Sequence, residues 1–227
     1  MTPTSNATSN ATSNVTNDAS HPSGTPAPRP RRARLSVPDL VTIGVFTALY
    51  FVCVTVATFA CAVVAGFGSV FLPAVAALVS GPVFMLMVAR VGRFGGITVM
   101  GVVLGLFLLV SGHFALSFVT SLVFPVLADL VALLGRYRNR ALLLVSYVVF
   151  GYGLTGPILP LWFMKDAYVA SLEARGKDAA YIADLFAPIN AGSFVAAMAA
   201  IAVCGVLGGW FGRRLCAKHF AKAGLVR

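Results

Sequence analysis

The stretch LVTIGVFTALYFVCVTVATFACAVV, Leu40–Val64, contains no charged side chain. A helix needs about 20 predominantly apolar residues to cross the hydrocarbon core of a bilayer. The stretch is therefore predicted to be a membrane-spanning helix. It is far longer than the apolar region of about 7–15 residues in a cleavable signal peptide, so we expect it to stay in the mature protein.

The rest of the chain repeats this pattern. Hydrophobic residues make up 59% of the 227 residues, charged residues 11%, and the mean hydropathy is +0.89. Barrel-forming strands would show short segments of alternating hydrophobicity, whereas this chain has long unbroken apolar runs. The sequence therefore predicts an all-α membrane protein, a bundle of six transmembrane helices. The six runs are Leu40–Val64, Val70–Ala89, Ile97–Ser111, Phe114–Leu134, Ala141–Phe163 and Ala191–Phe211.

The net charge of +10 is distributed unevenly between the loops. When the loops are assigned alternately to two sides of a membrane, one side receives only Lys165, Arg175 and Lys177, which leaves 14 of the 17 Lys and Arg residues for the side of the N-terminus. Lys and Arg accumulate in cytoplasmic loops. Both termini are therefore predicted to be cytoplasmic, in a multi-pass protein of the cell (plasma) membrane. Nucleic-acid binding is the weaker interpretation, because the basic residues are scattered over several segments at membrane ends.

Residues 1–36 are predicted to be a disordered cytoplasmic tail, because repeats such as TSNATSNATSNVTND cannot bury a core. The basic end of this tail, Arg29–Arg34, either rests against anionic lipid headgroups or only anchors the topology, and we favour the second interpretation. Residues 37–216 are predicted to form the six-helix membrane domain. Residues 217–227 are expected to be a short basic cytoplasmic tail.

One connection, Lys165–Pro188, is much longer than the others and is predicted to lie outside. It contains three basic and four acidic residues, so it lacks the positive charge of a cytoplasmic loop. Apolar residues at i, i+4 spacing on both sides of Gly176 predict two short amphipathic helices joined at this glycine. A loop with its own helices is more often a lid or a binding element than a linker. A helix pair lying on the headgroups is the alternative.

The fifth span is weakened near its outer end. Five glycines and prolines fall within GYGLTGPILP, Gly151–Pro160. Non-helical backbone at membrane depth survives only against protein or a cavity, so this part is predicted to border a pocket that faces outward. Trp162 is equally well explained as an interfacial anchor, and His113 as a headgroup-level histidine. The candidate substrate-binding residues are Phe67, Ser69, His113, Tyr152, Thr155, Trp162, Tyr168 and Asn190.

Catalytic and metal-binding constellations are absent from the sequence, so the chain is not expected to be an enzyme or to hold a cofactor. It has no G-x-x-x-x-G-K-[ST] phosphate loop, so ATP-driven transport would need an ATPase on another subunit. Asp129 is interpreted as a buried carboxylate paired with Arg136 or Arg138 rather than as a proton relay. It lies roughly 24 Å along the fourth span from His113, which is too far for shared chemistry.

Small residues four positions apart occur repeatedly in the predicted spans. Such pairs let helices approach closely in lipid. Internal packing explains most of them, and at least one is a candidate for contact with another protein. The pairs are Gly44–Ala48, Gly101–Gly105, Gly205–Gly209 and Gly208–Gly212.

Several longer stretches resemble a known family. They are LVTIGVFTALYFV, SGPVFMLMVARVGRFGGITVMGVVLGL, SGHF, LAD, PLWFMKDAY and KHFAKAGL, in this order. From about Val37 to Val226 the chain is similar to the Trep-Strep family, also called MptD-like. Its members are described as candidate substrate-binding S components of energy-coupling factor (ECF) transporters.

The resemblance implies a six-helix S component that binds a vitamin or similar micronutrient at the outer side. It also implies docking on a transmembrane T component that is driven by two ATPase subunits. The family's typical docking motif in the first span is Ala-x-x-x-Ala, and Gly44-x-x-x-Ala48 stands in its place here. No vitamin-binding residue set aligns, so the substrate stays open, although an aromatic and nearly uncharged site favours a planar or weakly charged small molecule. A stand-alone small-solute carrier is the alternative, but the sequence shows neither internal repeats nor a polar path.

Overall fold

The structure is a computed structural model that describes residues 35–62 and 67–220, without the side chains of residues 67–69, 219 and 220. Nearly all of the predicted N-terminal tail and most of the predicted C-terminal tail lie outside these residues. Every regular element in the described part of the chain is a helix, which confirms the all-α prediction.

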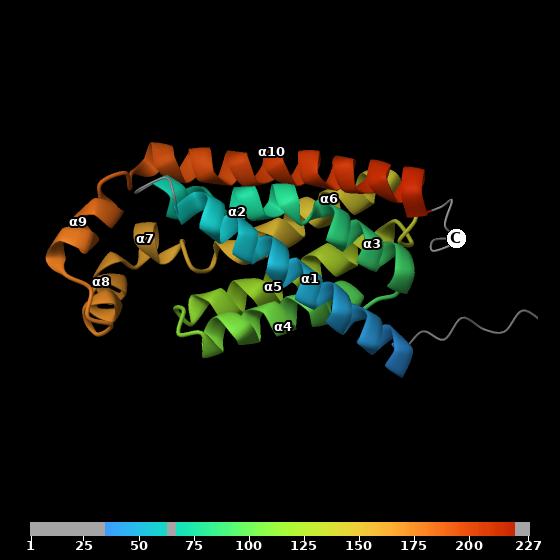
Figure 1. Ribbon diagram of the computed structural model, residues 1–227, viewed down its shortest axis with the longest axis horizontal. Helices are drawn as coiled ribbons and strands as arrows, with labels where there is room; N and C mark the ends of the chain where they lie inside the picture. The colour runs from blue at the N-terminus through green and yellow to red at the C-terminus, as the bar shows by residue number, and fades with distance from the viewer. Residues whose placement is uncertain (1–34, 63–66, 221–227) are drawn as a thin grey trace, which may run out of the picture. The chain divides into compact units, whose positions relative to one another are not determined.

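Six helices or helix groups form the bundle, and two of these are broken (Figure 1). The continuous helices are α1 (Val37–Ala62), α4 (Gly96–Val110), α5 (Leu116–Leu134) and α10 (Ala191–Leu215), which continues into the π-helical turn η2 (Cys216–Phe220). The broken ones are α2 (Phe67–Val79) with α3 (Gly81–Val91), and α6 (Arg140–Tyr152) with the 3₁₀ turn η1 (Gly153–Thr155) and α7 (Pro160–Phe163). Two further helices, α8 (Lys165–Glu173) and α9 (Ala179–Phe186), form the long connection.

Three of the described helices are long and apolar enough to cross a membrane: α1, α5 and the segment Ala191–Lys218. The pair α2–α3, bent by 52°, would make a fourth crossing. Helix α4 and the segment Arg140–Thr155 are apolar but shorter. Six crossings therefore remain a prediction, because two of the six apolar runs form helices shorter than a full span.

The exposed surface is apolar, as expected for a protein surrounded by lipid. Phe59 on α1 is 72% exposed and Phe211 on α10 is 56% exposed. The interior is aromatic: the ring of Phe150 lies 5.5 Å from that of Tyr50 and 5.0 Å from that of Phe84, centroid to centroid. In water, so much exposed apolar surface would drive association, whereas lipid tails solvate it. The packing therefore agrees with an integral membrane protein.

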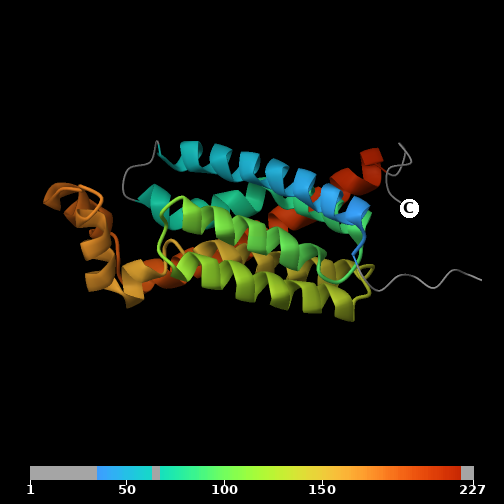
Figure 2. The ribbon, with the colours of Figure 1, turned by 90° about the horizontal axis from the view of Figure 1, so that it is seen from below.

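The two ends of the bundle differ in charge. The start of α1, the α3–α4 and α5–α6 turns and the end of α10 lie at one end, and α8 and α9 lie at the other (Figures 1 and 2). Of the 11 described Lys and Arg residues, three lie on the α8–α9 segment, which leaves eight at the first end. We call this first end the arginine-rich end. Its described basic residues are Arg90, Arg93, Arg136, Arg138, Arg140, Arg213, Arg214 and Lys218.

Asp129 on α5 is fully buried, and its carboxylate receives donors from two elements. One oxygen accepts from the backbone N–H of Gly95 at 2.8 Å, and from the N–H and hydroxyl of Thr98 at 3.1 and 2.9 Å. The other oxygen accepts from the hydroxyl of Tyr137 at 2.6 Å. Burial, and then the bond to Asp129, raises the pKa of the Tyr137 phenol, which keeps it protonated as a donor. The carboxylate thus joins α5 to the start of α4.

The prediction that Asp129 pairs with Arg136 or Arg138 is wrong. Both arginines are exposed, and in the described part of the chain neither forms a salt bridge. The first N–H groups of a helix lack partners within the helix and carry a partial positive charge, so they satisfy a carboxylate without a second ion. Burying an arginine beside Asp129 would have added the desolvation of its charge.

The bend between α2 and α3 interrupts the helical hydrogen bonds, and side-chain hydroxyls donate to two of the backbone carbonyls before it. Pro82, in the first turn of α3, has no N–H to donate to the carbonyl of Leu78 one turn earlier. The hydroxyl of Tyr147 on α6 donates to the carbonyl of Ala77 at 2.5 Å, and Ser80 donates to the carbonyl of Ala76. A hydrogen bond from α6 therefore helps to hold α2 at the bend.

We expect Tyr147→Phe to lower the free energy of unfolding by about 1–2 kcal/mol, because the buried Ala77 carbonyl then loses its donor. Tyr50→Phe is the matched control. Tyr50 is equally buried, and its hydroxyl has no hydrogen-bond partner among the described residues, so its loss should be neutral or slightly stabilising. Thermal unfolding of the purified variants in detergent measures both changes. Equal destabilisation by the two variants would contradict this role for Tyr147.

Candidate functional site

The break that follows α6 packs against α5. The hydroxyls of Thr120 and Ser121 donate to the carbonyl of Gly153 at 3.1 and 3.2 Å, which satisfies a group that the broken helix leaves free. Gly156 lies so close to α5 that an added Cβ would fall 2.3 Å from the Cα of Ser117. The space that remains there is about 10 Å³, enough for one water molecule. The predicted break is confirmed, but a ligand-sized space lies farther along the chain, beside α7.

A groove of about 600 Å³ lies at the end of the bundle that carries α8 and α9. Its walls come from α7, from the first residue of α8, from the end of α9 with the turn that follows it, and from the first turns of α10. This volume is within the range of small-molecule sites. The lining is apolar or aromatic, with two polar side chains, Lys165 and Asn190. We call this space the α7–α10 groove.

Three aromatic rings form one wall of the α7–α10 groove. The ring of Phe194 on α10 lies 5.4 Å from Trp162 and 5.5 Å from Phe163, both on α7, in edge-to-face contacts. The indole N–H of Trp162 donates to the carbonyl of Asn190 at 3.0 Å and so ties α7 to the start of α10. Because this N–H is already bonded, Trp162 offers a ring surface to a ligand rather than a donor.

Asn190 lies in the groove lining and begins α10 as its N-cap residue. Its side-chain oxygen accepts from the N–H of Ser193, and the Ser193 hydroxyl accepts from the N–H of Asn190, both at 2.9 Å. This reciprocal pair is a capping box. The side-chain nitrogen of Asn190 donates to the carbonyl of Pro188 at 3.3 Å. The side chain of Asn190 therefore serves mainly to start the helix that forms the aromatic wall.

Lys165 brings the only charge among the described residues that line the groove. Its Nζ lies 5.1 Å from the ring centroid of Phe186, a cation–π contact. In the described part of the chain, the single salt bridge joins Arg93 to Asp39 at 2.6 Å, at the arginine-rich end. Lys165 therefore has no described carboxylate partner, and the groove carries a net positive charge.

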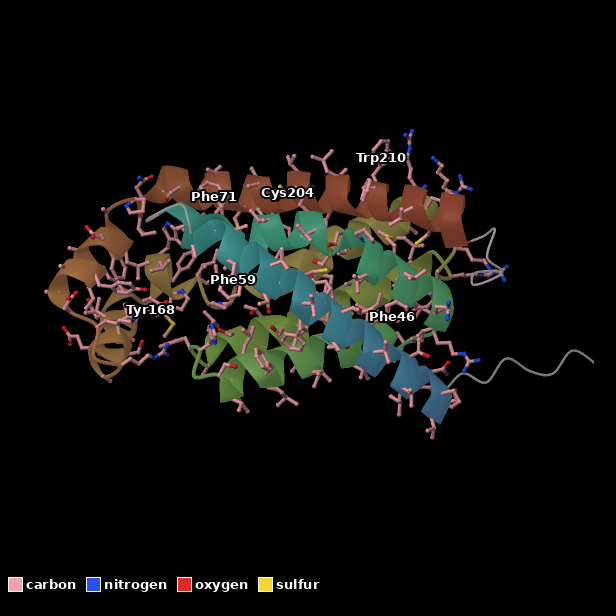
Figure 3. The ribbon with its side chains drawn as sticks, in the orientation of Figure 1. Phe46, Phe59, Phe71, Tyr168, Cys204 and Trp210 are labelled. Atoms are coloured by element: carbon pink, nitrogen blue, oxygen red, sulfur yellow. The ribbon has the colours of Figure 1, made fainter. Side chains whose placement is uncertain are left out.

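The helix pair α8–α9 packs against the bundle beside the groove. The ring of Tyr168 lies 6.3 Å from that of Phe114 and 6.5 Å from that of Phe186, and Leu172 is buried. Figure 3 shows Tyr168 where the helix pair meets the bundle. Burial raises the pKa of the Tyr168 phenol, so it is protonated at neutral pH. Gly176 turns the chain between the two helices with a φ of 72°, which confirms the prediction of two helices joined at this glycine.

Three of the sequence-predicted site residues lie elsewhere. The hydroxyl of Tyr152 donates to the carbonyl of Met198 at 2.9 Å, which joins α6 to α10. Thr155 is buried and donates to the carbonyl of Tyr152 at 2.7 Å. His113 is exposed in the turn between α4 and α5. Tyr152 and Thr155 thus serve the packing of the broken helix rather than the groove.

The remaining predicted residues divide between the groove and its surroundings. Trp162 and Asn190 line it together. Tyr168 contacts Phe186, which also lines it. The side chains of Phe67 and Ser69 are outside the described residues. The sequence analysis did not predict Lys165 or the aromatic residues Phe163, Phe186 and Phe194 as part of the site. The adjacent aromatic residues in LWF, which lie on α7, are the one signal in the sequence that could have indicated them.

A protein-family model matches residues 37–222, a range that contains every described helix. The family is Trep_Strep, whose description is a hypothetical bacterial integral membrane protein. The chain belongs to this family. No curated protein and no solved structure matches the chain. Membership in the Trep-Strep family confirms the resemblance and the membrane nature of the chain, and the family description names no activity.

The small-residue pairs of this Trep-Strep protein divide into two kinds. A Cβ added at Gly101 would lie 2.1 Å from Pro125 on α5, and one added at Gly208 would lie 2.4 Å from the carbonyl oxygen of Ala77. These glycines are needed for packing inside the bundle. Gly44 and Ala48 on α1 are exposed instead, and no described atom lies within 4 Å of a Cβ added at Gly44. Of the pairs noted in the sequence, Gly44–Ala48 therefore faces outward.

Proposed function

We propose that the protein is the substrate-binding (S) subunit of an energy-coupling-factor type ABC importer for a vitamin or other micronutrient. The observation that carries the proposal is the α7–α10 groove, which has the size of a small-molecule site and lies opposite the arginine-rich end. With the arginine-rich end in the cytoplasm, as the distribution of Lys and Arg favours, the groove opens to the outside, where a nutrient arrives.

The outward-facing Gly44–Ala48 pair supports a partner helix on α1. Exposed Val41, Val45 and Leu49 flank the two small residues, so this face of α1 is apolar and carries its smallest side chains at Gly44 and Ala48. Small residues four apart let two helix backbones come close in lipid. We assign this face to the T component. ATP hydrolysis is assigned to two partner ATPase subunits, because the sequence contains no phosphate loop.

Reconstitution into liposomes tests the proposed function. The purified chain is inserted alone, or together with a T component and its two ATPases, and the uptake of a panel of radiolabelled vitamins is measured. ATP-dependent uptake that needs the partner subunits is the expected result. Uptake by the chain alone would favour the second candidate, a stand-alone small-solute carrier. Absence of uptake and of binding for every compound would reject both.

The double variant Gly44→Leu with Ala48→Leu is expected to lower co-purification with the T component at least tenfold, because the larger side chains hold α1 and the partner helix apart. Ligand binding by the isolated chain should not change, since both residues are exposed and far along the chain from the groove residues. Ala199→Leu on the exposed face of α10 is the matched control and should leave co-purification intact. Undiminished co-purification of the double variant would place the docking face elsewhere.

A further inference from the structure

The charge of the α7–α10 groove indicates which charge its ligand carries. Lys165 is positive, and no described residue that lines the groove is acidic. Asp166 follows Lys165 in the chain but does not line the groove. The exposed ammonium group already contacts the ring of Phe186, and a ligand with one negative charge would add a charge-assisted hydrogen bond that a neutral ligand cannot form.

The position of Lys165 is not explained by helix stability. Lys165 is the first residue of α8, where the helix dipole is positive and a cation is unfavourable. Ala191, the first residue of α10, also lines the groove, so a second positive helix end faces the same space. Asp166 in the first turn of α8 offsets the dipole of that helix, so Lys165 and the start of α10 are the two sources of positive potential at the groove, and both attract an anion.

The aromatic wall favours a flat ligand. Phe194 meets Trp162 and Phe163 edge to face, an arrangement that leaves ring surface free to contact a further ring. The side chain of Leu161, 3% exposed, closes the groove from within. A ligand with two or more charges would place the additional charge among these apolar groups without a partner, which is costly.

We propose that the substrate is a planar aromatic carboxylate with a single negative charge. This proposal rests on the importer function proposed above. Its ring packs against the aromatic wall and its carboxylate is directed to Lys165. The substrate class thus narrows from micronutrients in general to small aromatic monocarboxylic acids.

Equilibrium dialysis with matched probes tests the class. The purified chain in phosphatidylcholine nanodiscs is dialysed against naphthalene-2-carboxylate, the neutral naphthalene-2-carboxamide and the saturated decahydronaphthalene-2-carboxylate. We expect the aromatic carboxylate to bind about fivefold more tightly than the carboxamide, the contribution of one partly exposed ion pair. It should also bind about tenfold more tightly than the saturated acid, through ring contacts.

Two lysines of the same segment provide a matched pair of variants. Lys165→Gln should remove the preference for the carboxylate over the carboxamide. Lys177→Gln should keep it, because the Nζ of Lys177 lies 4.7 Å from the ring of Tyr181 and outside the groove lining. Ala191→Trp should block all probes, since Ala191 is exposed and a large side chain there fills the groove without removing a core contact. Equal effects of the two lysine variants would overturn the role of Lys165.

The remaining outcomes separate this proposal from the importer function. If carboxamide and carboxylate bind equally and Ala191→Trp blocks both, the groove is a binding site and the anionic class is wrong. If Ala191→Trp leaves ATP-dependent uptake intact, the importer function stands and the groove is not its substrate site. If phosphatidylglycerol in the nanodiscs displaces the probe, and does so only when Lys165 is present, the groove holds a lipid headgroup and the proposal is overturned.

Discussion

Asp129→Ala is expected to lower the free energy of unfolding by about 3–5 kcal/mol, one of the two largest effects of a single substitution that we foresee. Alanine removes the acceptor of the backbone N–H groups of Gly95 and Thr98 and of the Tyr137 hydroxyl. The carboxylate itself is fully buried, so water cannot take its place at low cost. The midpoint of thermal unfolding in detergent should fall by roughly 6–20 °C.

Substitution of Asp129 by asparagine, and of Arg136 and Arg138 by glutamine, tests which groups are the partners of the carboxylate. Asp129→Asn keeps one acceptor oxygen and should cost about half as much as alanine. Arg136→Gln and Arg138→Gln should have almost no effect, because both side chains are exposed and unpaired among the described residues. A loss of stability in either arginine variant as large as that of Asp129→Ala would restore the ion pair expected from the sequence. Asp184→Ala, on the exposed side of α9, is the control for removing a carboxylate.

Gly208→Ala is expected to cost about 3 kcal/mol of stability, and Gly208→Leu to prevent the folded bundle from forming. An added Cβ would lie 2.4 Å from the carbonyl oxygen of Ala77 and 2.6 Å from that of Leu78, at the bend between α2 and α3. Both neighbours are backbone atoms, so they cannot move aside as the end of a side chain can. Alanine gains about 1 kcal/mol of helix propensity over glycine, which is too little to offset this overlap.

Gly44→Ala is the matched control for Gly208→Ala. Both glycines lie within long helices, but no described atom lies within 4 Å of a Cβ added at Gly44. At Gly44 only the higher helix propensity of alanine acts. Gly44→Ala should therefore leave the stability of the isolated chain unchanged or raise it by up to about 1 kcal/mol. Thermal unfolding of both variants measures the difference. If Gly208→Ala unfolds at the same temperature as Gly44→Ala, α10 does not approach the bend as closely as described.

Some residues of the α7–α10 groove could be predicted from the sequence and others could not. Trp162 is a candidate from the broken outer part of the fifth span and Asn190 from the start of the sixth, and the two do meet, through a hydrogen bond between residues 28 positions apart. Phe194 and Lys165 were not chosen, since neither breaks a helical pattern nor stands out by composition. They became recognisable only when α7 was seen to pack beside the first turns of α10. The glycine-rich break also drew attention to Tyr152 and Thr155, but the Tyr152 hydroxyl joins α6 to the carbonyl of Met198 on α10, and the Thr155 hydroxyl donates to the carbonyl of Tyr152.

The sequence by itself determined that the chain is helical and membrane-embedded and that its basic residues are distributed unevenly between two ends. It also determined that a pair of short helices lies between the last two apolar segments. Hydrophobic length and charge are properties of continuous segments, so they can be summed along the chain without knowing which segments touch. Only the tertiary structure decided the partners of Asp129, the outward direction of Gly44 and Ala48, and the position of the groove. Each of these depends on which side of one helix meets which side of another, and similar small and apolar residues occur on every side of these helices.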